Sequence, residues 1–184
     1  MPSPVVIILA AGRAERFFAS GATTHKLDAP LNGLPVAEHV LRAVKASGLA
    51  WHLVRPAGGT PGMGDSISLG VRATREASGW LILPADLPLI QPDSLLRVAS
   101  ALLQMPVVVP CYRQRQGHPV GFSRQFREAL IALSGETGAR KIVAAARKQN
   151  KVMDLDVADY GIVHDIDTLT DLQQTQQWLS AGKS

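Results

Sequence analysis

The feature that most constrains this chain is the apolar run Val5-Val6-Ile7-Ile8-Leu9-Ala10-Ala11, which ends at Gly12 and is followed by Arg13. Its first four residues are β-branched, and the run is far shorter than the ~20 apolar residues of a membrane span. A short run of branched side chains is typical of a strand that is buried on both faces. The run therefore predicts the central strand of an α/β sheet.

The small residues at the end of this strand predict a site for an anionic ligand. Gly12 has no Cβ, and Ala10 and Ala11 have only a methyl group, so backbone N–H groups there can approach a ligand closely. Open α/β sheets bind ligands at the carboxyl ends of their strands, and Arg13 and Arg16 follow at once. The loop is neither a dinucleotide fingerprint nor a Walker loop, because it lacks G-x-G-x-x-G and Gly-Lys-Ser/Thr.

The first two thirds of the chain alternate strands with helices. Apolar strands are expected at 51–55, 80–84 and 106–110. Helices are expected from Leu34-Pro35 to Gly48, after the glycine- and proline-rich loop 56–64, and from Pro92. Asp65 or Ser66 is placed to cap the second of these helices. The alternation predicts an α/β fold in three layers: a mostly parallel, Rossmann-like sheet with helices on both faces.

The last third of the chain follows a different pattern. Residues 116–122 read as a turn entering an edge strand, because Pro119 lacks the N–H that a central strand needs. Helices are expected at about 124–133 and 137–148, and strands at 151–156 and 161–164. Thr168 and Asp171 have the spacing of a capping box, which predicts that a final helix begins there.

Length and composition fit one globular domain over residues 1–184. Hydrophobic residues make up 46% of the chain and charged residues 18%, and no stretch is long enough to span a membrane. The residues before the first strand contain no basic region or cleavage site, so we expect a cytoplasmic protein. The single cysteine, Cys111, excludes an internal disulfide and a cysteine-based zinc site, and it is interpreted as a small buried hydrophobe.

Charge is unevenly distributed along the chain. Residues 113–151 hold nine Lys or Arg against Glu128 and Glu136, whereas residues 154–171 hold six aspartates and no Lys or Arg. The basic segment is either a solvated helical face or a surface that docks a polyanion. It lacks the interleaved aromatic residues of a single-strand platform, which argues against a nucleic acid partner.

Several motifs follow one another along the chain. They are Leu9-Ala10-Ala11-Gly12-x-x-x-Arg16 with Lys26, residues 62–70 (GMGDSISLG), Pro84-Ala85-Asp86-Leu87-Pro88, Gly117-His118-Pro119-Val120, Gly135-x-x-Gly138-Ala139-Arg140, and Asp165-Ile166-Asp167-Thr168 with Asp171-Leu172. Taken together and in this order, they resemble the molybdenum cofactor cytidylyltransferases, a family with the fold of the nucleotide-diphospho-sugar transferases. The resemblance spans nearly the whole chain.

The resemblance implies an enzyme that transfers CMP from CTP to the phosphate of molybdopterin, releasing pyrophosphate with the help of Mg²⁺. It assigns Arg16, Lys26 and Asp86 to catalysis. It assigns Asp86 and Asp167 to the metal, with Asp165 as the alternative to Asp167, and His118 and Arg140 to the acceptor. Nucleotide binding is assigned to Leu9, Ala10, Ala11, Gly12, Arg13, Lys26, Gly64, Ser66 and Asp86.

From the residues alone, Asp86 can be explained in two ways. An isolated carboxylate that follows a buried strand is costly to desolvate, and a bound cation would compensate its charge. Alternatively, Asp86 caps a helix or turn. Thr168 is best explained as a helix cap, and His118 is either an acceptor contact or a structural histidine.

Two departures from the family pattern keep other functions open. Arg16 and Lys26 are ten positions apart, which is longer than usual, and only one strand and a loop fit between Gly48 and Gly62. The alternatives are a nucleotidyltransferase that uses GTP or a sugar-phosphate acceptor, and a non-catalytic carrier. The carrier would deliver molybdenum cofactor to a molybdenum-dependent apo-enzyme through the basic segment.

Overall fold

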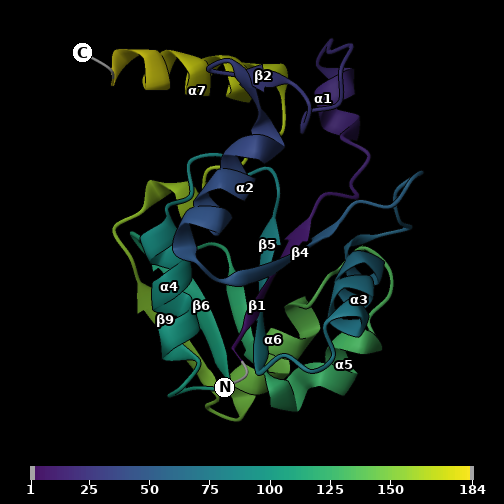
Figure 1. Cartoon of the computed structure of the whole chain (residues 1–184), viewed down its shortest axis with the longest axis vertical. Coiled ribbons are helices and arrows are strands. Elements are labelled where there is room, and N and C mark those ends of the chain that lie inside the picture. Colours follow the sequence, from purple (N-terminus) through teal and green to yellow (C-terminus); the bar gives the residue numbers. More distant parts are fainter. Residues whose placement is uncertain (1–2, 183–184) are drawn as a thin grey trace.

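The computed structural model describes residues 3–182, in which a mixed sheet lies between two layers of helices (Figure 1). The sheet has the order β4-β1-β5-β8-β6-β7, and β9 pairs with β6. Its strands are β1 (Val5–Leu9), β4 (Ala50–Val54), β5 (Gly79–Pro84), β6 (Val107–Tyr112), β7 (Arg115–Gln116), β8 (Val120–Ser123) and β9 (Val152–Asp156). A small hairpin of β2 (Pro30–Leu31) and β3 (Leu34–Pro35) turns at Asn32-Gly33.

The helices are α1 (Glu15–Ala19), α2 (Val36–Ser47), α3 (Met63–Ala73), α4 (Pro92–Ala101), α5 (Arg127–Ile131), α6 (Arg140–Lys148) and α7 (Leu169–Ala181), with 3-10 turns at Arg124–Phe126 and Tyr160–Ile162. As predicted, Gly48 ends α2 in the left-handed conformation, and Pro92 is the first residue of α4. Among residues 3–182, no helix combines the length and the apolar character that crossing a bilayer requires.

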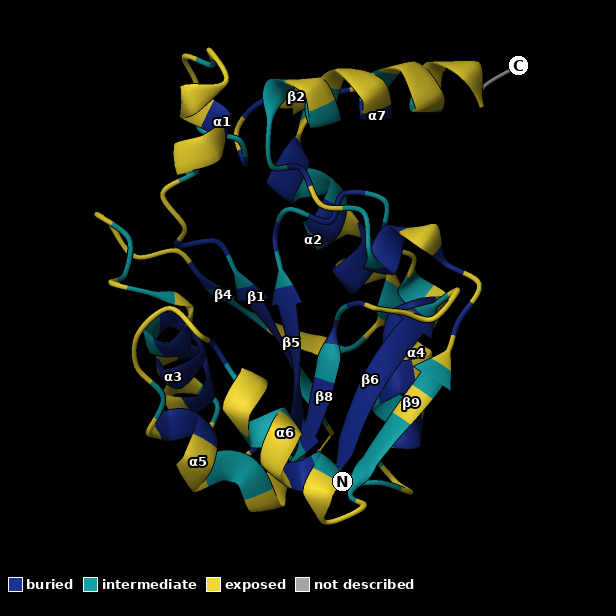
Figure 2. Cartoon of the chain, turned by 180° about the vertical axis from the view of Figure 1, so that it is seen from behind, coloured by how far each residue is buried: buried dark blue, intermediate teal, exposed yellow. Residues whose placement is uncertain are grey.

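Alternation along the strands divides the core between the two faces of the sheet. Val6 and Ile8 of β1 pack with α2 and α4 on one face, whereas Ile7 packs with α3 and α5 on the other. Leu81 and Leu83 of β5 likewise lie opposite Ile82. Figure 2 shows the central strands buried and α1 and α7 largely exposed. The predicted strand buried on both faces is confirmed, because side chains from both helical layers cover it.

The predicted three-layer α/β fold is confirmed, but the prediction of an edge strand at 116–122 is wrong. β1 is parallel to β4 and β5, while β8 is antiparallel to β5 and β6 and lies between them. Pro119 does not prevent this central position. The β5 ladder begins with Val120 opposite Ile82, so the missing N–H of Pro119 falls just outside it.

Three other local predictions are also wrong. Asp65 and Ser66 do not cap α3, which begins at Met63 with Gly62 as its N-cap. Residues 161–164 do not form a strand, because the Asp159 carboxylate accepts the Gly161 N–H and closes a 3-10 turn. The helix expected from residue 137 begins only at Arg140, after Gly138 in the left-handed conformation.

Candidate active site at the carboxyl ends of β1 and β5

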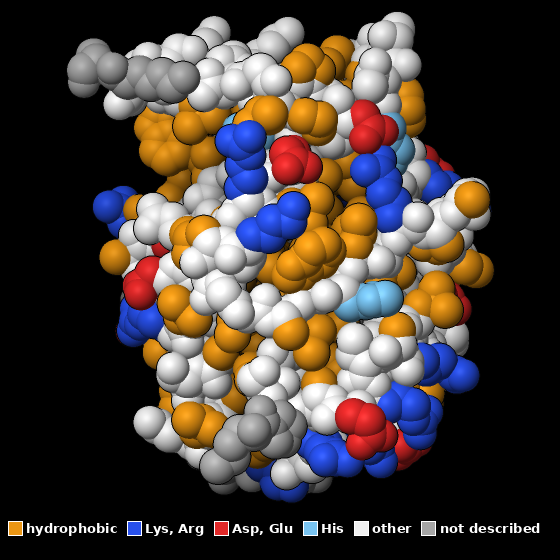
Figure 3. Space-filling view, in the orientation of Figure 1, with side chains coloured by type: hydrophobic (Ala, Val, Ile, Leu, Met, Phe, Trp, Pro, Cys, Tyr) orange, Lys and Arg blue, Asp and Glu red, His pale blue; other side chains and the backbone are white. Residues whose placement is uncertain are grey.

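A cavity of about 410 Å³ opens where β1 and β5 end. The loop after β1, the glycine-rich loop before α3, and the segments around Lys26, Asp86 and Asp167 surround it. Basic and acidic side chains lie close together in the upper half of the face shown in Figure 3. The lining residues are Leu9, Ala11–Arg16, His25–Leu27, Thr60–Met63, Ser66, Pro84, Asp86, Glu136 and Asp167.

Most of the residues predicted for the site lie on this cavity, but four do not. Ala10 is buried and its N–H donates to Val54 O, which fixes the loop to β4. A Cβ on Gly64 would meet Ser134 O at 2.8 Å, so this glycine serves close backbone packing. Arg140 is exposed at the start of α6, and His118 is largely buried near Asp86.

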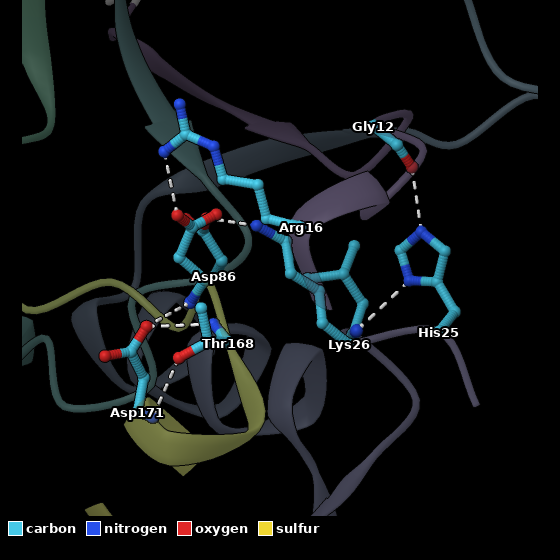
Figure 4. A network of polar contacts seen from close by, with 9 residues as sticks. Gly12, Arg16, His25, Lys26, Asp86, Thr168 and Asp171 are labelled. Carbon is cyan, nitrogen blue, oxygen red and sulfur yellow. Dashed lines mark hydrogen bonds and ion pairs between the residues drawn. The ribbon is translucent and has the colours of Figure 1, made fainter. Parts of the chain in front are cut away.

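Lys26 and Asp86 form an ion pair at the centre of the cavity. Lys26 Nζ donates to Asp86 Oδ2 at 2.8 Å, and the two side chains are only 16% and 18% exposed. The pairing excludes the interpretation of Asp86 as a helix or turn cap, because its carboxylate meets a side chain rather than backbone N–H groups. The inserted residues between Arg16 and Lys26 do not keep Lys26 away, since the chain returns to the cavity at His25 (Figure 4).

A second ion pair links the loop after β1 to the segment before α7. Arg16 donates to Asp167 Oδ2 at 2.9 Å, and this hydrogen bond raises the pKa of the Arg16 guanidinium. The predicted capping box at Thr168 and Asp171 is confirmed. The Asp171 carboxylate also accepts the Asp167 N–H at 2.9 Å, which orients the backbone that carries Asp167.

The glycine-rich loop is joined to residues 134–136. Gly64 N donates to Gly135 O at 2.8 Å, and Gly135 N donates to Asp65 Oδ2 at 3.1 Å. A Cβ on Gly62 would meet Gly135 O at 2.4 Å, so the close contact requires glycine. Across the loop, the Thr60 and Ser66 hydroxyls are 2.6 Å apart and share a hydrogen bond. The predicted Ser66 is therefore held on the cavity by a neighbour that the sequence did not indicate.

His118 and Asp165 lie close enough to Asp86 to feel its charge, and the pKa values of both are perturbed. Burial lowers the pKa of His118, against the opposing effect of the Asp86 and Asp165 charges, and its Nδ1 atom is buried without a hydrogen-bond partner. Burial also raises the pKa of Asp165, and the neighbouring Asp86 carboxylate adds to this effect. Asp165 is not among the residues that line the cavity, whereas Asp167 is.

The lowered pKa of His118 predicts that the protein loses stability in mild acid. The unfolded imidazole takes up a proton near its ordinary pKa of 6.5, but the folded state holds His118 neutral to a lower pH. Below about pH 6.5 the unfolded state therefore binds more protons, and the unfolding free energy falls with pH by at most ~1.4 kcal/mol per pH unit for this group. Denaturant unfolding at several pH values, compared with His118→Gln, should show a shallower slope in the variant. Equal slopes would contradict the prediction.

Sequence reasoning did not assign roles to His25, Thr60 and Glu136, all of which line the cavity. The adjacency of His25 to Lys26 was the available signal for the first. Thr60 lies in a loop whose composition indicates only irregular structure. Glu136 reaches the cavity because the chain after α5 returns to the glycine-rich loop, which no local pattern indicates.

The oxygen donors on the cavity fit a magnesium ion that binds together with a nucleotide. Within residues 3–182, no three His, Cys, Asp or Glu side chains are grouped to hold a metal by themselves. Magnesium, however, takes one or two protein carboxylates, and phosphate and water oxygens complete its shell. Asp86 and Asp167 line the same cavity, so two carboxylates of the required kind are present there.

Comparison with known proteins gives one family and several similar folds. The family model described as the MobA-like NTP transferase domain matches residues 45–152. A curated relative, the bifunctional protein GlmU of Xanthomonas euvesicatoria, is 29% identical over 145 residues. The alignment covers 67% of this chain but 30% of that protein, so the chain spans less than a third of the relative's length.

Three solved structures illustrate the similarity of fold. A nucleotidyl transferase from Methanothermobacter has a TM-score of 0.81 at 18% identity, covering 98% of this chain and 99% of that chain. Rv0371c from Mycobacterium tuberculosis in complex with manganese has a TM-score of 0.74 at 22% identity (95% and 98% covered). A molybdopterin-guanine dinucleotide biosynthesis protein A from Archaeoglobus fulgidus has a TM-score of 0.62 at 16% identity (96% and 99% covered). At these identities the likeness shows the fold alone.

Proposed function

Because the chain belongs to the family of MobA-like NTP transferase domains, we propose that it transfers CMP from CTP to the phosphate of molybdopterin or its molybdenum form. The observation that carries the proposal is the cavity itself. It joins a loop of small residues, the cations Arg13, Arg16 and Lys26, and two carboxylates at one edge of the sheet. A triphosphate with a divalent cation needs this combination of charges.

In the proposed reaction, an oxygen of the acceptor phosphate attacks the α-phosphorus of CTP. A new P–O bond forms there, the bond between the α-phosphorus and the bridging oxygen breaks, and pyrophosphate leaves with that electron pair. Since the acceptor is itself the nucleophile, the protein supplies positioning and charge stabilisation. The backbone N–H groups of residues 11–13 and the Arg16 and Lys26 side chains would bind the phosphates. Mg²⁺ held by Asp86 and Asp167 would neutralise further phosphate charge.

The preference for CTP rests on the sequence Leu9-Ala10-Ala11-Gly12, which resembles the cytidylyl branch more than the guanylyl branch. GTP is the alternative nucleotide, and a sugar phosphate is the alternative acceptor. The carrier hypothesis was motivated by the long spacing between Arg16 and Lys26. It loses that support, because Lys26 contacts Asp86 in the cavity.

The proposal predicts turnover with one nucleotide. The protein would be incubated with Mg²⁺, each of the four nucleoside triphosphates, and either reduced molybdenum cofactor or a sugar phosphate as the acceptor. Pyrophosphate release and nucleotide consumption would be measured for each pair. We expect CTP to be consumed and no turnover when EDTA removes the metal. If GTP is the one nucleotide consumed, the protein is a guanylyltransferase. If turnover occurs with a sugar phosphate but not with molybdenum cofactor, the acceptor is a sugar phosphate. No turnover with any pair would overturn the proposal.

A further inference from the structure

We propose that His25 is a positioning residue that holds the loop after β1 and the Lys26 backbone in one arrangement. The inference rests on the proposed function, because it assigns to His25 the preorganisation of two groups that would bind phosphates. It also explains how the long segment between Arg16 and Lys26 is accommodated. His25 lines the cavity, and its two ring nitrogens contact different parts of the site.

One nitrogen closes a turn around Lys26. Leu27 N donates to His25 Nδ1 at 3.1 Å, so the residues on either side of Lys26 are bonded to each other. The Lys26 backbone is thereby held in the turn while its Nζ reaches Asp86. A histidine that accepts from the amide two positions later acts like the side chain of an Asx turn.

The other nitrogen holds the loop after β1. His25 Nε2 lies 2.8 Å from Gly12 O (Figure 4). A backbone N–H can only donate and a carbonyl oxygen can only accept, so the two partners determine the tautomer. Nδ1 must be the bare acceptor for Leu27, and Nε2 must carry the hydrogen that it donates to Gly12. Neither the other neutral tautomer nor the imidazolium satisfies both contacts.

The contact with Gly12 also orients the next amide. In a trans peptide the C=O and the following N–H point in opposite directions. Holding the Gly12 carbonyl on His25 therefore directs the Arg13 N–H to the other side of that peptide unit. It also keeps a carbonyl oxygen occupied that would repel a phosphate. One ring thus orients the Arg13 N–H and holds the Lys26 backbone, both of which belong to groups that the proposed reaction uses.

Elements of the inserted segment support this arrangement. The Phe18 ring meets the His25 ring edge-on, with centroids 6.3 Å apart. Ser20 Oγ accepts the Leu169 N–H at 3.0 Å, which ties the segment to the first residue of α7. The inserted segment is therefore held at two points, by the His25 ring and by the backbone of Leu169.

Two substitutions separate the contacts. His25→Asn keeps an oxygen that can accept from Leu27 but cannot reach Gly12, and His25→Gln places an amide nitrogen where Nε2 lies but loses the turn. Calorimetry with CTP and Mg²⁺, and steady-state pyrophosphate release, would be measured on each. We expect His25→Asn to weaken CTP binding and raise KM about three- to tenfold, and His25→Gln to lower kcat by a similar factor.

His39→Gln is the matched control. His39 is also partly buried and bonds a backbone carbonyl, Leu31 O, at 2.6 Å, but it does not line the cavity. We expect this variant to keep the wild-type KM and kcat. If both His25 variants also keep them, or if both change the same constant by the same factor, the positioning role is overturned.

A spectroscopic test does not depend on turnover. Long-range ¹H–¹⁵N spectra of the wild-type protein without nucleotide should show His25 as the neutral Nε2–H tautomer. The His25 signal is assigned by its absence from the spectrum of His25→Gln. Nδ1–H, or an average of both tautomers, would overturn the inference even in an active enzyme. Conversely, the Nε2–H tautomer in a protein that turns over no nucleotide would leave the arrangement in place and overturn the proposed function.

Discussion

Replacing Asp86 by asparagine should lower turnover by about two to three orders of magnitude while the protein stays folded. The change removes a charge that would face the metal and the phosphates, and loss of such a group typically costs ~3–4 kcal/mol in the transition state. Asparagine keeps nearly the same volume and an oxygen that can still accept from Lys26 Nζ, 2.8 Å away. Stability should therefore fall by only ~1 kcal/mol. Pyrophosphate release and melting temperature would be measured on the same preparation.

Asp154→Asn is the control for Asp86→Asn. Asp154 also accepts from a cation, since Arg147 donates to both its oxygens at 2.8 and 2.7 Å, but it lies on β9 and does not line the cavity. Its substitution should leave kcat and metal dependence unchanged. An Asp86→Asn enzyme with wild-type turnover and metal dependence would remove Asp86 from the proposed site.

Replacing Lys26 by methionine should lower turnover by about two orders of magnitude and also destabilise the protein without metal. Lys26 would neutralise phosphate charge during transfer, and its loss removes that stabilisation. It also leaves the Asp86 carboxylate, only 18% exposed, without its partner. Leaving a largely buried charge unpaired should cost ~1–3 kcal/mol of unfolding free energy. Denaturant unfolding and steady-state rates would measure the two effects.

Magnesium should partly restore the stability of Lys26→Met. In the wild type a cation must compete with Lys26 for Asp86, whereas in the variant the carboxylate is open to it. Mg²⁺ without nucleotide should thus raise the melting temperature of Lys26→Met more than that of the wild type. Arg147→Met, which breaks the remote pair with Asp154, should show no such gain. Equal responses to Mg²⁺ in all three proteins would contradict binding of the ion by an unpaired Asp86.

Local patterns were sufficient for most of the secondary structure. The capping box at Thr168 and Asp171, the end of α2 at Gly48 and the start of α4 at Pro92 all occur where the sequence predicts them. Each depends on backbone conformation or on hydrogen bonds within one turn. The three-layer fold was also predictable, because the short apolar runs required burial on both faces.

Predictions from local patterns failed where contacts with residues far along the chain determine the local structure. The local pattern predicts a strand at Gly161, but a Cβ there would clash with Leu89 O, so close packing against another loop shapes the segment. Pro119 by itself predicts an edge strand, but the register places this residue one position before the ladder with β5 begins. The carboxylate of Asp65, expected as a cap, instead accepts from Gly135, 70 positions away.

The sequence by itself determined the central strand, the loop of small residues after it, and the kinds of side chain available to a phosphate site. Those properties depend on contiguous residues, whose hydrophobic pattern and side-chain size are given directly by the sequence. Only the tertiary structure decided which charges meet. Lys26 reaches Asp86 across 60 positions and Arg16 reaches Asp167 across 151, while His25 holds Gly12 across 13. Such contacts form only when the sheet and the inserted segment bring the two side chains within a few ångströms of each other. That distance depends on the fold of all the residues between them.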